Sequence, residues 1–88
     1  MSGIEVRFPV GSLWQIHKKH VVVAVYSNKK PVWVISPTKL RYLDTFLILK
    51  HEDYRNGFLQ AKILLNNNIY FIDINHSSDF YFKCLNSH

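Results

Sequence analysis

The chain lacks several features that hold together or target many small proteins. Cys84 is its single cysteine, which excludes an internal disulfide framework and fits a reducing compartment. No stretch approaches the roughly 20 apolar residues of a membrane-spanning helix. The first residues also lack the basic stretch and apolar core of a secretory signal. We therefore expect a cytoplasmic protein with no membrane contact.

Glycine and proline are scarce as well, with three of each, and the sequence contains no Gly/Ser linker. Eighty-eight residues are too few for two independently buried cores, so residues 1–88 are expected to form one domain. Because 48% of the residues are hydrophobic and 15% are aromatic, an ordered core is expected. The enrichment in β-branched and aromatic residues favours strands over helices.

Acidic residues are few and unevenly placed. Seven Lys/Arg lie between Arg7 and Leu43 with no Asp or Glu among them. Residues 1–50 hold eight Lys/Arg against Glu5 and Asp44, a balance of +6, whereas residues 51–88 carry −1. An uneven basic balance points to an anionic partner, with nucleic acid foremost. The alternative is a solvated surface that keeps a small β-protein soluble and its edge strands unpaired.

The clearest structural pattern is a β-hairpin made of residues 58–65 and 69–74. Asparagine tolerates positive φ, so Asn67-Asn68 is predicted to form a two-residue turn. The resulting apolar face pairs Leu65 with Tyr70, Ile63 with Ile72 and Ala61 with Ile74, and the other face pairs Lys62 with Asp73 and Leu64 with Phe71. A three-residue loop would place Asp73 on the apolar face, so the two-residue turn is preferred.

Further strands are predicted at 13–17, 20–26, 32–36 and 45–50, and Val21, Val23 and Val25 share one face of the second. Residues 38–44 are expected to be a loop or a helical turn, and residues 52–57 a polar turn. The tail, 77–85, is expected to form a helical turn with Asp79 as N-cap or a short closing strand. Together these predict an all-β fold, a small antiparallel SH3-like barrel of five to six strands. An OB-like barrel is less favoured because its third and fourth strands usually need a longer connection or a helix between them.

Two segments resemble the opening of MazF-type ribonuclease toxins. They are Val10-Gly11-Ser12-Leu13-Trp14-Gln15-Ile16 and Pro31-Val32-Trp33-Val34-Ile35-Ser36-Pro37. In this chain Lys30 stands where that family has an arginine, and Ser12 stands where an acidic residue is usual. The resemblance covers about thirty residues and implies an SH3-like barrel.

Residues 57–64 and 69–72 are similar to the central hairpin of KOW- or Tudor-like small barrels, and to bacteriophage accessory proteins that use them. This resemblance also implies a small SH3-like barrel. A compact chain rich in Asn and Lys suits an AT-rich phage genome.

Lysine and arginine neutralise phosphates, and aromatic faces stack on unpaired bases. The candidate nucleic-acid-binding residues are Lys18, Lys19, Lys29, Lys30, Lys39, Arg41, Trp14, Trp33 and Tyr42. Trp33 shares a face with Pro31 and Ile35, so a core position for it is an open alternative. The hypothesis is a non-enzymatic module that binds RNA or DNA through this surface.

Other chemistry is less well supported by the sequence. The five histidines are scattered without paired cysteines, so no metal site or cofactor is expected, and exposed turn histidines are preferred. His76-Ser77-Ser78-Asp79 holds the residue types of a hydrolase triad, but as neighbours in a loop, where turn or cap roles are more usual. Cys84 lies in an apolar tail and is expected to be packed. No catalytic residue is predicted.

Two alternatives remain. One is a protein–protein module, such as a phage-encoded modulator or inhibitor of a host enzyme, or a homodimer. Its interface would be an exposed apolar patch, with Leu64, Phe71, Phe80, Tyr81 and Phe82 as the candidate residues. The other is a MazF-like ribonuclease.

Overall fold

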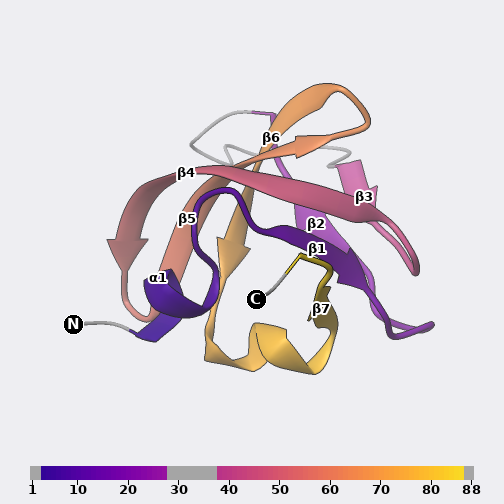
Figure 1. Cartoon of the computed structure of the whole chain (residues 1–88), viewed down its shortest axis with the longest axis horizontal. Coiled ribbons are helices and arrows are strands. Elements are labelled where there is room, and N and C mark those ends of the chain that lie inside the picture. The colour runs from indigo at the N-terminus through magenta and orange to yellow at the C-terminus, as the bar shows by residue number, and fades with distance from the viewer. Residues whose placement is uncertain (1–2, 28–37, 87–88) are drawn as a thin grey trace.

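The computed structural model describes residues 3–27 and 38–86. Two antiparallel sheets make up most of the described chain, one five-stranded with the order β6-β5-β4-β1-β7 and one two-stranded, β2-β3 (Figure 1). The elements are α1 (Gly3–Arg7), β1 (Leu13–Ile16), β2 (Val23–Val25), β3 (Thr38–Leu40), β4 (Thr45–Arg55), β5 (Phe58–Leu65), β6 (Asn68–Ile74), the 3₁₀ helix η1 (His76–Phe80) and β7 (Phe82–Cys84). A bridge between Tyr26 and Phe71 joins the chain after β2 to β6. The predicted small, antiparallel, all-β fold is confirmed.

Alternation of side chains along the strands builds the core. Leu59, Ala61, Ile63 and Leu65 are buried on β5, while the residues between them are partly exposed. Ile72 and Ile74 on β6 extend the same buried cluster. Because successive side chains of a strand point to opposite faces, these residues line the inner face of the sheet. The predicted apolar face of the hairpin is therefore confirmed.

The pairing register of that hairpin was predicted wrongly. The two-residue turn is Asn66-Asn67, with φ of 50° and 65°, and Asn68 already pairs with Leu65. Positive φ at both central residues is typical of a type I′ turn, whose twist matches the twist of the two flanking strands. A shift of two residues leaves every side chain on its predicted face but changes its partner. Lys62 therefore lies opposite Phe71, and Asp73 lies opposite Gln60.

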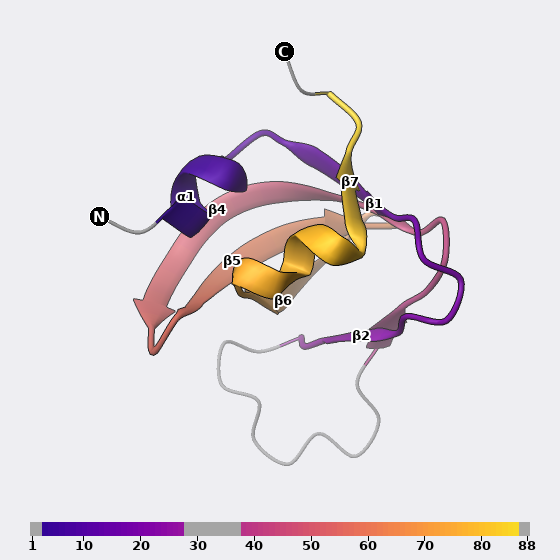
Figure 2. The same cartoon turned by 90° about the horizontal axis from the view of Figure 1, so that it is seen from below.

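The strands also differ from prediction in extent. Residues 38–44, expected to be a loop or helical turn, begin with β3, which pairs with β2. β4 continues to Arg55 through residues predicted as a turn, and only Asn56-Gly57, with φ of 52° and 82°, remains as the turn. Register irregularities interrupt the β4–β5 pairing, and such bulges bend a strand, consistent with the curvature of β4 and β5 in Figure 2. The strand predicted at 32–36 lies outside the described residues.

The first and last described elements, α1 and β7, contribute to the core through their own or adjacent residues. The helix α1, which the sequence analysis did not anticipate, brings Ile4 and the following Phe8 into the core. The Phe8 ring lies 4.3 Å from the Trp14 ring, centroid to centroid. The tail forms both of the predicted alternatives, a 3₁₀ turn and then β7, which pairs with β1.

The N-cap of the 3₁₀ turn is Asn75, where Asp79 was predicted. The Asn75 side chain accepts a hydrogen bond from the Ser77 N–H, and the Ser78 hydroxyl accepts one from the Asn75 N–H. This reciprocal capping box satisfies donors at the start of the turn.

Candidate nucleic-acid interface

Two connections that are distant in sequence form one end of the molecule. Residues 17–22 join β1 to β2, and residues 41–44 join β3 to β4. They lie side by side at the right of both views (Figures 1 and 2). Backbone hydrogen bonds fix this arrangement, from the Leu43 N–H to the Ile16 carbonyl at 2.9 Å and from the Ile16 N–H to the Asp44 carbonyl at 3.1 Å. We call the surface made by Lys18, Lys19, Lys39, Arg41, Tyr42 and Leu43 the basic end.

A cation and an aromatic ring meet at the basic end. The Lys19 Nζ lies 6.0 Å from the centroid of the Tyr42 ring, at the edge of the distance over which an ammonium is attracted to an aromatic face. Tyr42 is 41% exposed, and Lys18, Lys19 and Arg41 are exposed as well. The arrangement therefore offers positive charge and an accessible aromatic ring together.

Hydrogen bonds between its first and last residues stabilise the Arg41–Asp44 turn, which contains Tyr42. The Asp44 N–H donates to the Arg41 carbonyl at 2.9 Å, and the Arg41 N–H donates to Asp44 Oδ2 at 2.7 Å. Asp44 is the acidic group of this turn, and its carboxylate is engaged with the backbone. Gln15 adds a side-chain bond, from Nε2 to the Leu43 carbonyl at 3.3 Å. The position of Tyr42 thus follows from a defined turn.

The structure groups some of the predicted nucleic-acid residues and separates others. Lys39 is exposed on β3 beside Arg41, so it extends the basic end. Trp14 was predicted wrongly as a stacking residue, because it is only 7% exposed and packs in the core. The side-chain alternation of β1, which also buries Ile16, was the available signal. Lys29, Lys30 and Trp33 lie outside the described residues.

Lys83 is a basic residue that the sequence analysis did not place at this site. It is exposed on β7 and pairs with Gln15, whose side chain reaches the basic end. Lys83 and Gln15 are far apart in the sequence, so the pairing of β7 with β1 is what places Lys83 beside Gln15. Leu43 was likewise missed, because its signal is a backbone conformation, with φ of 73°.

The predicted apolar interface patch does not form. Phe71 and Phe82, expected to be exposed, are 8% and 4% exposed. The reason is tertiary: Phe71 lies where the chain at Tyr26 pairs with β6, and Phe82 packs edge-on against Phe46, with ring centroids 5.1 Å apart. Leu64 and Tyr81 are partly buried. Of these five candidates, Phe80 is the one with a largely exposed side chain, at 73%.

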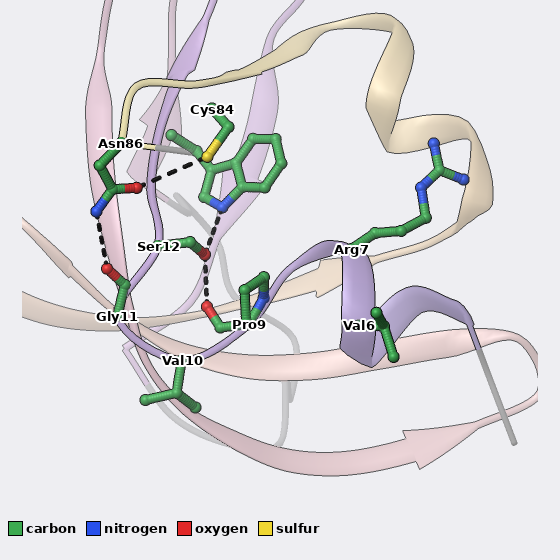
Figure 3. Close-up of a pocket in the computed structure, with 9 residues that line it drawn as sticks. Val6, Arg7, Pro9, Val10, Gly11, Ser12, Cys84 and Asn86 are labelled. Carbon is green, nitrogen blue, oxygen red and sulfur yellow. Dashed lines mark hydrogen bonds between the residues drawn. The ribbon is translucent and has the colours of Figure 1, made fainter. Parts of the chain in front are cut away.

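A cavity of about 410 Å³ lies at another part of the molecule, beside α1 (Figure 3). Its lining consists of Val6, Arg7, Pro9, Val10, Gly11, Ser12, Trp14, Cys84 and Asn86. The polar groups of Ser12, Cys84 and Asn86 are used in intramolecular bonds, including one from Asn86 Nδ2 to the Gly11 carbonyl at 3.0 Å. The cavity therefore presents mainly apolar surface to a ligand.

The remaining chemistry-bearing residues are dispersed or structural. In residues 3–27 and 38–86, no group of three or more His, Cys, Asp or Glu could hold a metal ion. His51, expected in an exposed turn, is instead partly buried on β4, with Nε2 2.7 Å from the Phe8 carbonyl oxygen. Asp73 is exposed on β6, but partial desolvation of its carboxyl raises its pKa above the ordinary value of 3.8. No described helix is long and apolar enough to cross a membrane.

Comparisons with known proteins give no relative from which a function could be transferred. No protein-family model matches the chain, and neither the curated proteins nor the solved structures contain a match.

Proposed function

We propose that this protein is a small, non-enzymatic module that binds RNA or DNA through its basic end. The observation that carries the proposal is the placement of the Lys19 ammonium over the exposed Tyr42 ring, beside Lys18 and Arg41. Phosphates attract the cations, and the aromatic ring offers a face for a base. Distant segments contribute these groups to one surface, which supports a binding role over a diffuse solubilising charge.

The two kinds of contact have different energetic signatures. Each phosphate neutralised by Lys or Arg releases a counterion, so affinity falls as salt rises. Stacking of a base on an aromatic side chain contributes about 1–3 kcal/mol and depends little on sequence. A surface that combines them binds nucleic acid tightly at low salt and discriminates weakly between sequences.

The SH3-like barrel, of the KOW or Tudor kind, is part of this proposal. It is supported by the strand order, in which β1 lies between the β4-β5-β6 meander and the last strand, β7. The short η1 turn immediately before β7 agrees with it. In such a barrel, connections between strands are the usual positions for binding residues.

The test is fluorescence anisotropy with labelled single-stranded RNA and duplex DNA at about 50 and about 200 mM salt. The double variant Lys18→Ala/Lys19→Ala should weaken binding to every sequence and reduce the salt slope by up to about 2. The matched control is Lys50→Ala/Lys62→Ala, which removes the same charge from β4 and β5 and should have a smaller effect.

Three results would contradict the proposal. They are absence of binding at low salt, an equal loss in both double variants, and cleavage of the RNA during the assay. The last result would indicate a ribonuclease.

A protein–protein module is the second candidate. It is favoured by Val6 and Val10, which are 70% and 56% exposed at the lining of the cavity in Figure 3. Exposed apolar side chains gathered at one place often mark an interface. If the wild-type protein binds no nucleic acid, a pull-down that compares wild type with a Val6→Ser/Val10→Ser variant tests this candidate. The candidate requires a protein partner that wild type retains and the variant does not.

A further inference from the structure

Leu43 has a backbone conformation that leucine rarely adopts. In residues 3–27 and 38–86, positive φ occurs at Gly11, Gly57, Asn56, Asn66, Asn67 and Leu43. Glycine has no Cβ to clash, and asparagine is several-fold enriched in this region. Leucine has neither advantage, so its conformation at φ of 73° is strained.

The fold requires the turn at this position but does not require a leucine side chain. Its N–H donates to the Ile16 carbonyl, and its carbonyl accepts from the Gln15 side chain. These contacts use backbone atoms, which any residue except proline supplies. The side chain is 55% exposed and does not belong to the buried core cluster. Asparagine or glycine would therefore hold the same turn with less strain.

We propose that Leu43 is a ligand-contact residue, and that Tyr42 and Leu43 form an apolar tip that selects unpaired bases. This inference rests on the proposed nucleic-acid function and specifies its ligand as single-stranded nucleic acid. One base stacks on the Tyr42 ring, and Leu43 packs against the neighbouring nucleotide. Lys18, Lys19 and Arg41 hold the phosphates on either side.

The choice of single strands follows from the chemistry of the tip. Binding through phosphates alone needs cations and gains nothing from an exposed leucine. Apolar contacts of this kind need base faces, which a duplex keeps stacked on each other and a single strand leaves open. Strained residues are also found preferentially at functional sites, where the conformation presents a side chain to a ligand.

The experiment compares Leu43→Asn and Leu43→Gly with wild type in thermal unfolding and in binding to labelled single-stranded RNA and a duplex of equal length. Relief of strain and loss of partial burial act in opposite directions, so Tm should stay within about 4 °C of wild type. Affinity for the single strand should fall at least about 5-fold with an unchanged salt slope, because the phosphate contacts remain. Duplex affinity should change less than about 2-fold. Asn56→Gly, at the β4–β5 turn, is the control and should leave binding unchanged.

Each other outcome is decisive. A fall in Tm of more than about 8 °C in both variants would show that the leucine side chain is structural. Unchanged single-strand affinity, or an equal loss on duplex, would overturn the ligand assignment while leaving the proposed function standing. If wild type binds no nucleic acid at low salt, the proposed function itself fails, and this inference fails with it.

Discussion

Replacing Ser12 by alanine should destabilise the protein through one buried hydrogen bond. Ser12 and Trp14 are 6% and 7% exposed, and Trp14 Nε1 donates to Ser12 Oγ at 2.7 Å. The Ser12 hydroxyl in turn donates to the Pro9 carbonyl oxygen (Figure 3). The Ser12→Ala variant deletes both bonds while leaving the backbone unchanged.

The two lost bonds have unequal consequences. The Pro9 carbonyl still accepts from the Ser12 N–H, at 3.1 Å, so it keeps a partner. The indole N–H is left in the core without its acceptor, which costs about 1–3 kcal/mol. For a domain of this size, each kcal/mol lowers Tm by about 4–8 °C.

Urea unfolding followed by far-ultraviolet circular dichroism measures the free energy of unfolding, provided that the m-value stays constant. A double-mutant cycle with Trp14→Phe isolates the hydrogen bond, because phenylalanine has no N–H to leave unsatisfied. The Ser12→Ala change should then cost at least about 1 kcal/mol less in the Trp14→Phe background. Ser77→Ala, at an exposed position, is the control and should stay within about 0.5 kcal/mol of wild type.

Additive effects in the cycle would refute this reasoning. Additivity would mean that the destabilisation arises from packing around Ser12 and not from the indole N–H. A Ser12→Ala cost below about 0.5 kcal/mol would refute it as well, because the buried donor would then have found another partner.

Three further predictions concern turns and titration. Gly57→Ala should lower the free energy of unfolding by about 1–2 kcal/mol. The cost comes from the φ of +82° and not from a clash, because a Cβ there meets open space. Gly3→Ala, which also meets open space but has no positive φ, should be close to neutral, and equal effects of the two changes in urea unfolding would contradict this. Asn66→Gly should preserve or raise stability and Asn68→Gly should lower it, because Asn66 has positive φ in the turn whereas Asn68 is already paired in β6; the reverse order of stabilities would favour the other register. Asp73 binds its proton more tightly when folded, so its carboxyl should contribute stability at acidic pH that is lost as pH rises through its folded pKa, and Asp73→Asn should remove this contribution; identical pH profiles of the urea midpoint in wild type and Asp73→Asn would exclude it.

Local patterns predicted the elements best where a single strand carries the signal. The alternation along residues 58–65 predicted which side chains are buried. The predicted polar turn, residues 52–57, was too long, but it contains the observed turn at Asn56-Gly57. The charge run from Arg7 to Leu43 placed Lys18, Lys19, Lys39 and Arg41 among the candidates. These features depend on spacing within one segment, so no other part of the chain was needed to read them.

The errors share a physical cause, which is dependence on a distant partner. β3 is recognisable as a strand only through its pairing with β2. Phe71 is buried at the position where Tyr26, distant in sequence, pairs with β6. Trp14 was predicted as a stacking residue, but it is buried, and the Phe8 ring packs against it. Burial at such positions is decided by what covers them.

The sequence alone predicts an all-β fold, the inner face of its central hairpin and the uneven placement of charge. These follow from the two-residue period of a strand and from the conformational tolerance of Asn and Gly. The hairpin register depends on the tertiary structure, because a shift of two residues preserves both faces. The proximity of residues 17–22 to residues 41–44 is likewise tertiary, because backbone bonds between Ile16 and the Arg41–Asp44 turn bring Lys19 to Tyr42.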